Sequence, residues 1–354
     1  MIAITRCRYF FSHSSSDLLL LMTRVLTSYD SRCLQFECNL LDPTTGAVTS
    51  KGVACPKGGP SKAVVIGGWQ EGRGAAIGAQ YTAHEFNNSY FVENIKEELD
   101  AENEWFYDEV EETIYLIPTA GRRPQDMQLV ASKLARVMQF NGTVQKPIMH
   151  VGLHNVTVAH SAYTYMEQYE IPSGGDWSIH RGASVFMDGA ESISVDGCDF
   201  DQIDGNGIFL SRYVRNCSLA RNDFKAIGDS AILVVGAAGA GRIDNSRNKQ
   251  YPAYNVIEEN HVDGVGVWVK QTAAYFKAVT RDNPIKNNVF HDSPRSLVNY
   301  NDGFAGGEQL TSNLLLNSVM ESNDHGPVSD DMCSGSVAVH RPLPLPLLPA
   351  TDAL

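Results

Sequence analysis

The chain has 354 residues, of which 43% are hydrophobic and 19% charged, a globular composition long enough for one large core or two domains. Its net charge of −13 and the lack of a basic stripe argue against a nucleic-acid partner, because phosphate contacts need clustered Lys and Arg. No apolar run is long enough to predict a transmembrane helix.

Residues 1–59 carry no repeat, and we expect an irregular or divergent N-terminal segment. Arg6, Arg8 and the short apolar run Leu18–Met22 do not make a clear secretion signal, because a small-residue cleavage site is missing. Four N-x-S/T sequons, which are glycosylation sites in secreted proteins, favour secretion instead; they lie at Asn87, Asn141, Asn155 and Asn216. The two observations point in opposite directions, so the localisation stays unknown at this level.

Residues 60–145 are expected to be rich in β-structure. Glu104–Asp108 and Thr113–Pro118 are aromatic or aliphatic runs on either side of the acidic turn Glu109–Glu112, which predicts a hairpin. Residues 124–140 fit either an amphipathic helix or a strand-rich connection. Because the open end of a solenoid exposes strand edges and apolar core, we expect 60–145 to form an N-terminal cap.

Residues 146–332 contain a degenerate repeat with a spacing of 24–38 residues, typical of stacked supersecondary units. Each unit carries short runs that alternate with period two, such as Ser192–Val195 and Ala231–Val235, separated by Asn, Asp and Gly. Such a unit cannot enclose a core alone, whereas stacked coils can, so the pattern predicts a parallel β-helix. We expect the asparagines to form the bends and to hydrogen-bond from coil to coil. The anchors of the repeat are Cys198, Asn222, Asn260, Asn288 and Asn317.

The last segment, 333–354, has four prolines from Pro342 onward and no repeat phase, so we expect an irregular tail. The seven cysteines show no CxxC pair and no zinc spacing, so Cys198 and Cys217 are interpreted as small buried residues. We expect a monomer.

Three stretches carry a resemblance to a known superfamily: Gly67–Gly74, Phe91–Pro118, and Lys270–Pro327 with its closing Asp324-His325-Gly326-Pro327. Over roughly residues 60–330 the chain resembles the right-handed parallel β-helix, pectin-lyase-like superfamily. Within it, the chain is similar to carbohydrate-associated proteins related to glycoside hydrolases and polysaccharide lyases. The resemblance implies an all-β right-handed parallel β-helix, a polysaccharide or oligosaccharide partner and secretion. The superfamily also contains catalytically silent adhesins, so a non-catalytic glycan-binding or structural protein stays an alternative.

The repeat also predicts which residues stack along the helix, at about 4.8 Å per coil. Aligning Ala231 with Ala273, Leu297 and Gly326 places four side chains in one column. The coil of Ala273 carries an insertion around Val265–Gln271. The column consists of Asp229, Gln271, Arg295 and Asp324, with His325 in the next column. Strand parity places a second group on the outer face, which turns polar and aromatic in the later coils: Tyr275, Lys277, Asn299 and Asn301.

Hydrolysis of a glycosidic bond needs two carboxyl groups about 5–10 Å apart. Asp229 and Asp324 lie three coils apart in this alignment, roughly 14 Å, which is too far for that pair alone. The preferred catalytic set is therefore Asp302, Asp324 and His325, with Asp229 as a further candidate. The predicted substrate-binding residues are Arg295, Lys277, Gln271, Tyr275, Asn299, Asn301 and Trp268.

Two other interpretations remain at this level: a polysaccharide lyase, and purely structural roles for the candidate residues. A polysaccharide lyase would use Lys277 or Arg295 as the base, and a cation to neutralise the substrate carboxylate. No metal site is predicted and no EF-hand-like loop is present; calcium is the cofactor that the aspartates would suit. Asp229, Asp302 and His325 also fit turns or bends, and Trp268 and Tyr275 fit either sugar-stacking platforms or core positions.

Overall fold

The computed structural model divides the chain into two compact units, Met1–Ala131 and Ser132–Leu354. The residues that the structure describes are 2–3, 37–41, 48–54, 64–67, 90–93, 96–108, 110–127, 129–165, 167–170, 177, 179–237, 249–301, 305–321, 325–330 and 338–340.

The first unit is built from short strand pairs. The predicted hairpin is confirmed: β6 (Trp105–Asp108) and β7 (Thr113–Leu116) pair antiparallel across the acidic turn. The remaining elements are β1 (Ile2–Ala3) with β8 (Leu129–Val130), β2 (Glu37–Leu41) with β3 (Val48–Ala54), β4 (Val64–Gly67) with β5 (Tyr90–Glu93), and the 3₁₀ turns η1 (Lys96–Glu98) and η2 (Pro124–Asp126). A strand pair, β2 with β3, thus also occurs within 1–59, where an irregular or divergent segment was expected. The role of 60–145 as a cap stays a prediction.

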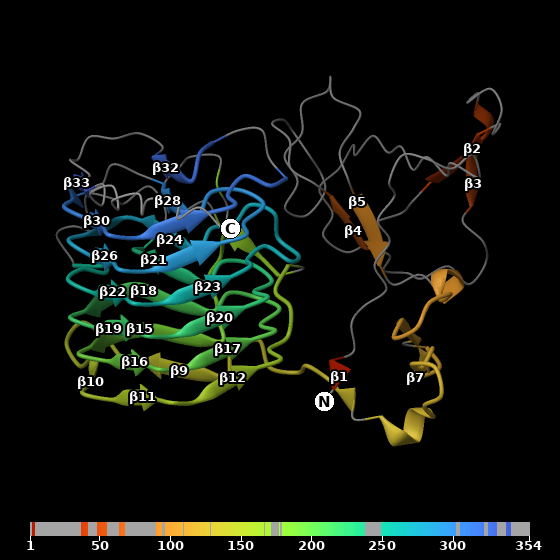
Figure 1. The fold of residues 1–354 in the computed structure, drawn as a ribbon, viewed down its shortest axis with the longest axis horizontal. Coiled ribbons are helices and arrows are strands. Elements are labelled where there is room, and N and C mark those ends of the chain that lie inside the picture. The colour runs from red at the N-terminus through yellow and green to blue at the C-terminus, as the bar shows by residue number, and fades with distance from the viewer. Residues whose placement is uncertain are drawn as a thin grey trace, which may run out of the picture. The chain divides into compact units, whose positions relative to one another are not determined.

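The second unit consists mainly of three parallel sheets, which Figure 1 shows as stacked coils running from β11 to β33 in chain order. The first sheet contains β9 (Met138–Asn141), β10 (Ile148–Met149), β15 (Val185–Glu191), β18 (Ile208–Arg215), β21 (Ile232–Val235), β24 (Tyr275–Ala278), β28 (Val298–Tyr300) and β32 (Val328–Asp330). The second contains β11 (Gly152–His154), β16 (Ser194–Asp196), β19 (Ser218–Ala220), β22 (Val256–Glu258), β26 (Pro284–Lys286), β30 (Gln309–Thr311) and β33 (Ala338–His340). The third contains β12 (Thr157–Ala159), β17 (Asp199–Asp201), β20 (Asp223–Lys225), β23 (His261–Asp263), β27 (Val289–His291) and β31 (Leu314–Leu316).

Most coils contribute one strand to each sheet, and equivalent strands of adjacent coils pair in parallel; the first coil supplies both β9 and β10 to the first sheet, where both pair with β15. This is the all-β parallel β-helix that the repeat predicted. Two strand pairs lie outside the three sheets: β13 (Tyr169–Glu170) with β14 (Ile179–His180), and β25 (Thr280–Arg281) with β29 (Ala305–Gly306). In the segment expected to be an irregular tail, Ala338–His340 forms β33, whose backbone pairs with β30.

The asparagines of the repeat lie at the corner between the second and third sheets, where they hydrogen-bond from coil to coil. Asn222 accepts a hydrogen bond from the Cys198 amide, and Asn260 and Asn288 continue the same ladder, each bonding its predecessor's backbone and side chain. The last member of the ladder is Asn313, not Asn317, because the register of β27 and β31 places Asn313 beside Asn288. The left-handed backbone falls one residue earlier, as at Arg221.

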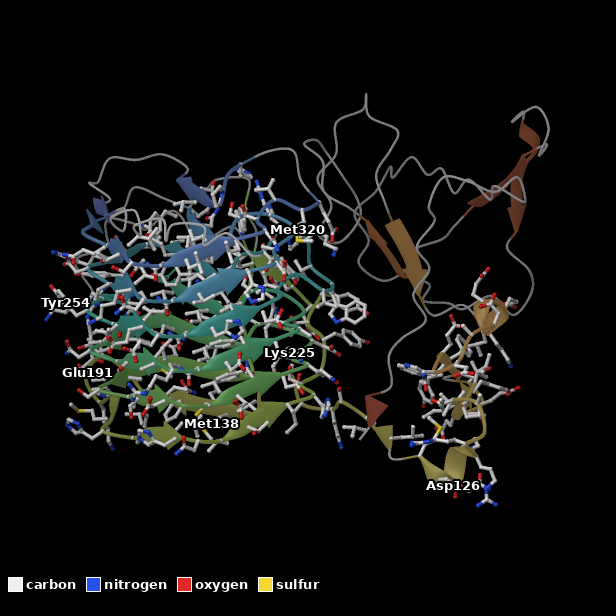
Figure 2. All side chains as sticks on the ribbon, in the orientation of Figure 1. Asp126, Met138, Glu191, Lys225, Tyr254 and Met320 are labelled. Atoms are coloured by element: carbon white, nitrogen blue, oxygen red, sulfur yellow. The ribbon has the colours of Figure 1, made fainter. Side chains whose placement is uncertain are left out.

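The interior of the coils is mainly apolar. Phe200 and Phe224 stack with their ring centroids 4.6 Å apart, and Cys198 and Cys217 are buried and not joined in a disulfide, as the composition suggested. Burial raises the pKa of the Cys217 thiol to about 12, which makes it an unreactive packing residue. Corner residues such as Glu191 and Tyr254 lie at the rim of the stack (Figure 2). Within the part of the chain that the structure describes, no helix has the length and apolarity to cross a membrane.

Candidate functional site on the outer face of the first sheet

The register of the first sheet decides which side chains face outward. Ile232 pairs with Tyr275, which pairs with Val298, and all three belong to the interior core. The outward ladder therefore contains Phe276 beside Asn299. The sequence alignment is off by one residue at this coil, because the insertion around Val265–Gln271 shifts the parity of the strand that follows it.

The prediction that Tyr275 and Lys277 lie on the outer face is therefore wrong. Tyr275 lies inside the coil, where burial raises the pKa of its hydroxyl well above the usual value. Lys277 also points inward, and its Nζ lies 3.9 Å from Glu308 Oε2 and 5.4 Å from the centre of the Tyr300 ring. A buried cation needs such a partner, because leaving water is costly for an isolated charge. Neither residue can contact a glycan on the outer face.

The same register changes the predicted column. Ile232, Tyr275, Val298 and Val328 are paired across adjacent coils. The residues three positions before them are Asp229, Thr272, Arg295 and His325, which therefore form the column. Thr272 thus replaces Gln271, which is buried nearby, and His325 takes the place predicted for Asp324. Asp229 and Arg295 keep their predicted column. Asp302 and Asp324 lie outside the described residues.

A segment between the third and first sheets covers this outer face. The described residues of this cover segment are 161–165, 167–170, 177 and 179–183. Trp177 is fully buried, and its ring centroid lies 5.5 Å from that of Phe276. Arg181 attaches the cover segment to the sheet, since its guanidinium donates to Ser211 Oγ at 2.9 Å and to the Gly236 carbonyl at 2.8 Å. The outer face is therefore an enclosed second core rather than an open surface.

Trp177 brings two predicted site residues together. The Arg295 guanidinium lies 4.0 Å from the centre of the Trp177 ring, a cation–π arrangement, and Arg295 is fully buried. The His325 ring lies 6.2 Å from Trp177, and its Nδ1 lies 3.2 Å from Ser329 Oγ. A cation, an imidazole and an aromatic face therefore meet under the cover segment.

Asp229 is the carboxylate of this column among the described residues. Its side chain is 3% exposed; Tyr169 of the cover segment donates to Oδ2 and Ser230 donates to Oδ1, both at 3.3 Å. Burial raises the pKa of Asp229 to about 7, and the two hydroxyl hydrogen bonds only partly oppose that rise. Asp229 can therefore hold a proton near neutral pH.

The remaining predicted residues divide into two groups. Asn299 and Asn301 are buried at the end of β28, and the Asn299 amide has no hydrogen-bond partner among the described residues. Trp268 is buried and donates from Nε1 to Asp204 Oδ1 at 3.1 Å, so its indole is a packing element rather than an open platform. The side-chain amide of Asn299, in contrast to the indole of Trp268, can therefore bind a hydroxyl group of a ligand.

Sequence reasoning missed the contributions of Tyr169 and Trp177. The repeat did not reach them, because they lie in an interval between sheets that is longer than in other coils. That excess length and its aromatic content were the available signal. A separate polar hollow of about 190 Å³ is lined by residues that include Asp188, Arg212 and Tyr213; Arg212 pairs with Asp188, and no predicted site residue lies there.

The fold and site together define a parallel β-helix protein with an enclosed polar cluster on its first sheet. No family model and no curated protein matches the chain. It is similar to a solved structure described as a glycoside hydrolase, with a TM-score of 0.57 and 18% identity, over 74% of this chain and 51% of that chain. The chain thus spans about half the length of that protein, and at this identity the similarity shows the fold.

Proposed function

We propose that the protein hydrolyses glycosidic bonds of a polysaccharide or oligosaccharide at the outer face of the first sheet, as a member of the pectin-lyase-like superfamily. The buried carboxyl of Asp229, with its pKa near 7, carries the proposal. A glycosidase needs a carboxylic acid that keeps its proton near neutral pH and donates it to the departing sugar oxygen. The similarity in fold to a glycoside hydrolase supports the same class.

The second carboxyl group must come from a residue nearer to Asp229 than His325. Asp229 and His325 stand three coils apart in the column, roughly 14 Å at the usual strand spacing. We propose Asp302 as the base or nucleophile, on its position in the sequence. His325 would then orient the substrate or exchange protons at a neighbouring sugar.

Substrate binding falls to the groups that surround Trp177. Arg295 supplies a buried positive charge and planar donors, and Asn299 an amide that can bond a sugar hydroxyl. Trp177 has an aromatic face suited to sugar C–H surfaces, and it belongs to the cover segment. Because Trp177 packs on Arg295 and Phe276, a sugar can bind there only when Trp177 moves away from these two side chains.

The test is incubation of the purified full chain with a panel of glycans, read for new reducing ends and for ultraviolet absorbance. Reducing ends without absorbance support hydrolysis. On the active glycan, Asp229→Asn should lower kcat roughly 100-fold or more, as loss of a general acid does. Asp302→Asn tests the proposed base or nucleophile, and the exposed Asp199→Asn, on the third sheet, serves as the matched control. Full turnover by Asp229→Asn would exclude it as the acid.

Two alternatives correspond to other outcomes of the same experiment. Elimination leaves an unsaturated product that absorbs in the ultraviolet, but the inward position of Lys277 removes one of the two bases that a lyase would use here. Folded protein that changes neither signal would favour a non-catalytic glycan-binding β-helix. In that case, Arg295→Met should still weaken glycan binding.

A further inference from the structure

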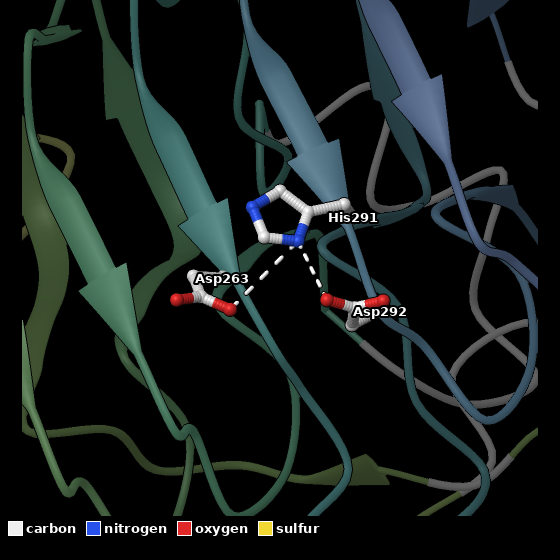
Figure 3. A group of neighbouring side chains, drawn as sticks. All are labelled: Asp263, His291 and Asp292. Carbon is white, nitrogen blue, oxygen red and sulfur yellow. Dashed lines mark hydrogen bonds and ion pairs between the residues drawn. The ribbon is translucent and has the colours of Figure 1, made fainter.

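A second cluster of chemically active side chains lies on the outer face of the third sheet, away from the first sheet. His261 of β23 and His291 of β27 lie on adjacent coils, with their Nε2 atoms 2.9 Å apart. His261 Nδ1 lies 2.8 Å from Asp223 Oδ1 of β20. His291 Nδ1 lies 2.7 Å from Asp292 Oδ2 and 3.7 Å from Asp263 Oδ1. Figure 3 shows both carboxylates on the Nδ1 side of His291.

The hydrogen bonds of this cluster conflict when both rings are neutral. A neutral imidazole has one N–H and one lone pair. If His261 donates from Nδ1 to Asp223 and His291 donates from Nδ1 to Asp292, the two Nε2 lone pairs face each other at 2.9 Å. The cluster needs one more positive centre to complete its hydrogen bonds.

A metal ion at His291 Nδ1 supplies that centre. The ion takes the Nδ1 lone pair and leaves the hydrogen of His291 on Nε2, which then donates to His261 Nε2. His261 keeps its Nδ1 hydrogen and donates it to Asp223. This chain of ligand, second histidine and carboxylate is the kind of outer shell that fixes the tautomer of a metal-bound histidine.

We propose that Asp263, His291 and Asp292 bind a divalent transition-metal ion of the zinc type, with His261 and Asp223 as the outer shell. The three ligand atoms lie within 4.8 Å of one another. Zinc binds imidazole nitrogen and carboxylate oxygen at about 2.0–2.2 Å, which places neighbouring ligands of a tetrahedral site roughly 3.3–3.5 Å apart. The observed 2.7 and 3.7 Å bracket that value, so small side-chain rotations are sufficient.

Supporting groups hold the ligands in place and leave an open side. Asn317 Nδ2 donates to Asp292 Oδ1 at 2.9 Å, which turns Oδ2 toward His291. The side chains of His291, Asp292 and Asp263 are 21%, 38% and 42% exposed, so an ion can enter and a water can complete the coordination.

The experiment is a calorimetric titration of the full chain with Zn²⁺. We expect saturable binding that His291→Gln and Asp292→Asn each weaken at least 10-fold, and a smaller loss for His261→Gln, which removes only an outer-shell contact. The matched control is His154→Gln: His154 Nδ1 lies 3.6 Å from Asp196, and among the described residues His154 belongs to no group of three potential ligands. This variant should bind as the unmodified protein does, and circular dichroism checks the folding of every variant.

Titration with Co²⁺ distinguishes this site from a cysteine site elsewhere in the chain. Nitrogen and oxygen ligands give d–d bands without thiolate charge-transfer absorption, and these bands should be lost in His291→Gln. Unchanged Zn²⁺ affinity in both His291→Gln and Asp292→Asn, with both variants folded, would overturn the proposal. So would the lack of any saturable binding, which would leave a proton shared between the two histidines as the positive centre.

Discussion

At the residue scale, Asp229 shows how the fold gives a common side chain an uncommon property. In the sequence it reads as a turn aspartate in Gly-Asp-Ser. The covering Tyr169 and the next coil exclude water from it, and desolvation of the charged form then dominates over the two hydroxyl hydrogen bonds. The column determines where Asp229 lies, and the cover segment over it causes the raised pKa.

The raised pKa predicts how stability depends on pH. The pKa of Asp229 is about 7 in the folded protein against an ordinary 3.8, so between these values the folded state keeps a proton that the unfolded state has lost. The stability contributed by the protonated form is complete below about pH 4 and is lost as pH rises to about 7. Relative to Asp229→Asn, the free energy of unfolding should fall by on the order of 4 kcal/mol from pH 4 to pH 8. Denaturant titrations at both pH values measure this, and a pH-independent difference would contradict it.

At the element scale, the asparagine ladder holds successive coils together at one corner. Asn260 accepts from the backbone and side chain of Asn222 at 3.1 and 2.9 Å, and donates to the Leu219 carbonyl and to Asn288 at 2.9 and 3.0 Å. All of these atoms are buried. Each coil therefore depends on its neighbour for the satisfaction of its polar groups.

Replacing one ladder residue should destabilise the contact between coils. Asn260→Ala removes the acceptor of the Asn222 backbone and side-chain amides and the donor to the Leu219 carbonyl, and each buried group left unsatisfied costs about 1–3 kcal/mol. We expect the free energy of unfolding to fall by roughly 3 kcal/mol or more, measured by denaturant titration. The control is Asn216→Gly at an exposed corner with a φ of 53°, where glycine fits and the change should stay within about 0.5 kcal/mol. Equal effects of the two substitutions would exclude the ladder as the cause.

At the scale of the whole molecule, charge predicts what the protein does not bind. The net charge of −13 repels a polyanion, and the sequence shows no basic stripe that would overcome this repulsion. In fluorescence anisotropy with duplex DNA at 150 mM salt we therefore expect no rise up to about 10 μM protein. Binding with a Kd below about 1 μM that weakens with added salt would contradict this prediction.

Local patterns in the sequence determined the parallel β-helix and the β6–β7 hairpin. Period-two alternation and corner asparagines recur from coil to coil, so one misplaced anchor such as Asn317 does not change the fold. They also placed Asp229 and Arg295 in one column, because coil-to-coil register follows from the strands themselves, but they put His325 in the next column.

Only the tertiary structure decided what surrounds those residues. The insertion before β24 shifts strand parity by one, which places Lys277 inside the coil, and local alternation cannot show how an insertion rejoins the sheet. The return of Trp177 over the first sheet and the meeting of His261 with His291 are contacts between segments distant in sequence. Burial and hydrogen bonding, which set the chemistry of a side chain, arise from such contacts and are not carried by the repeat.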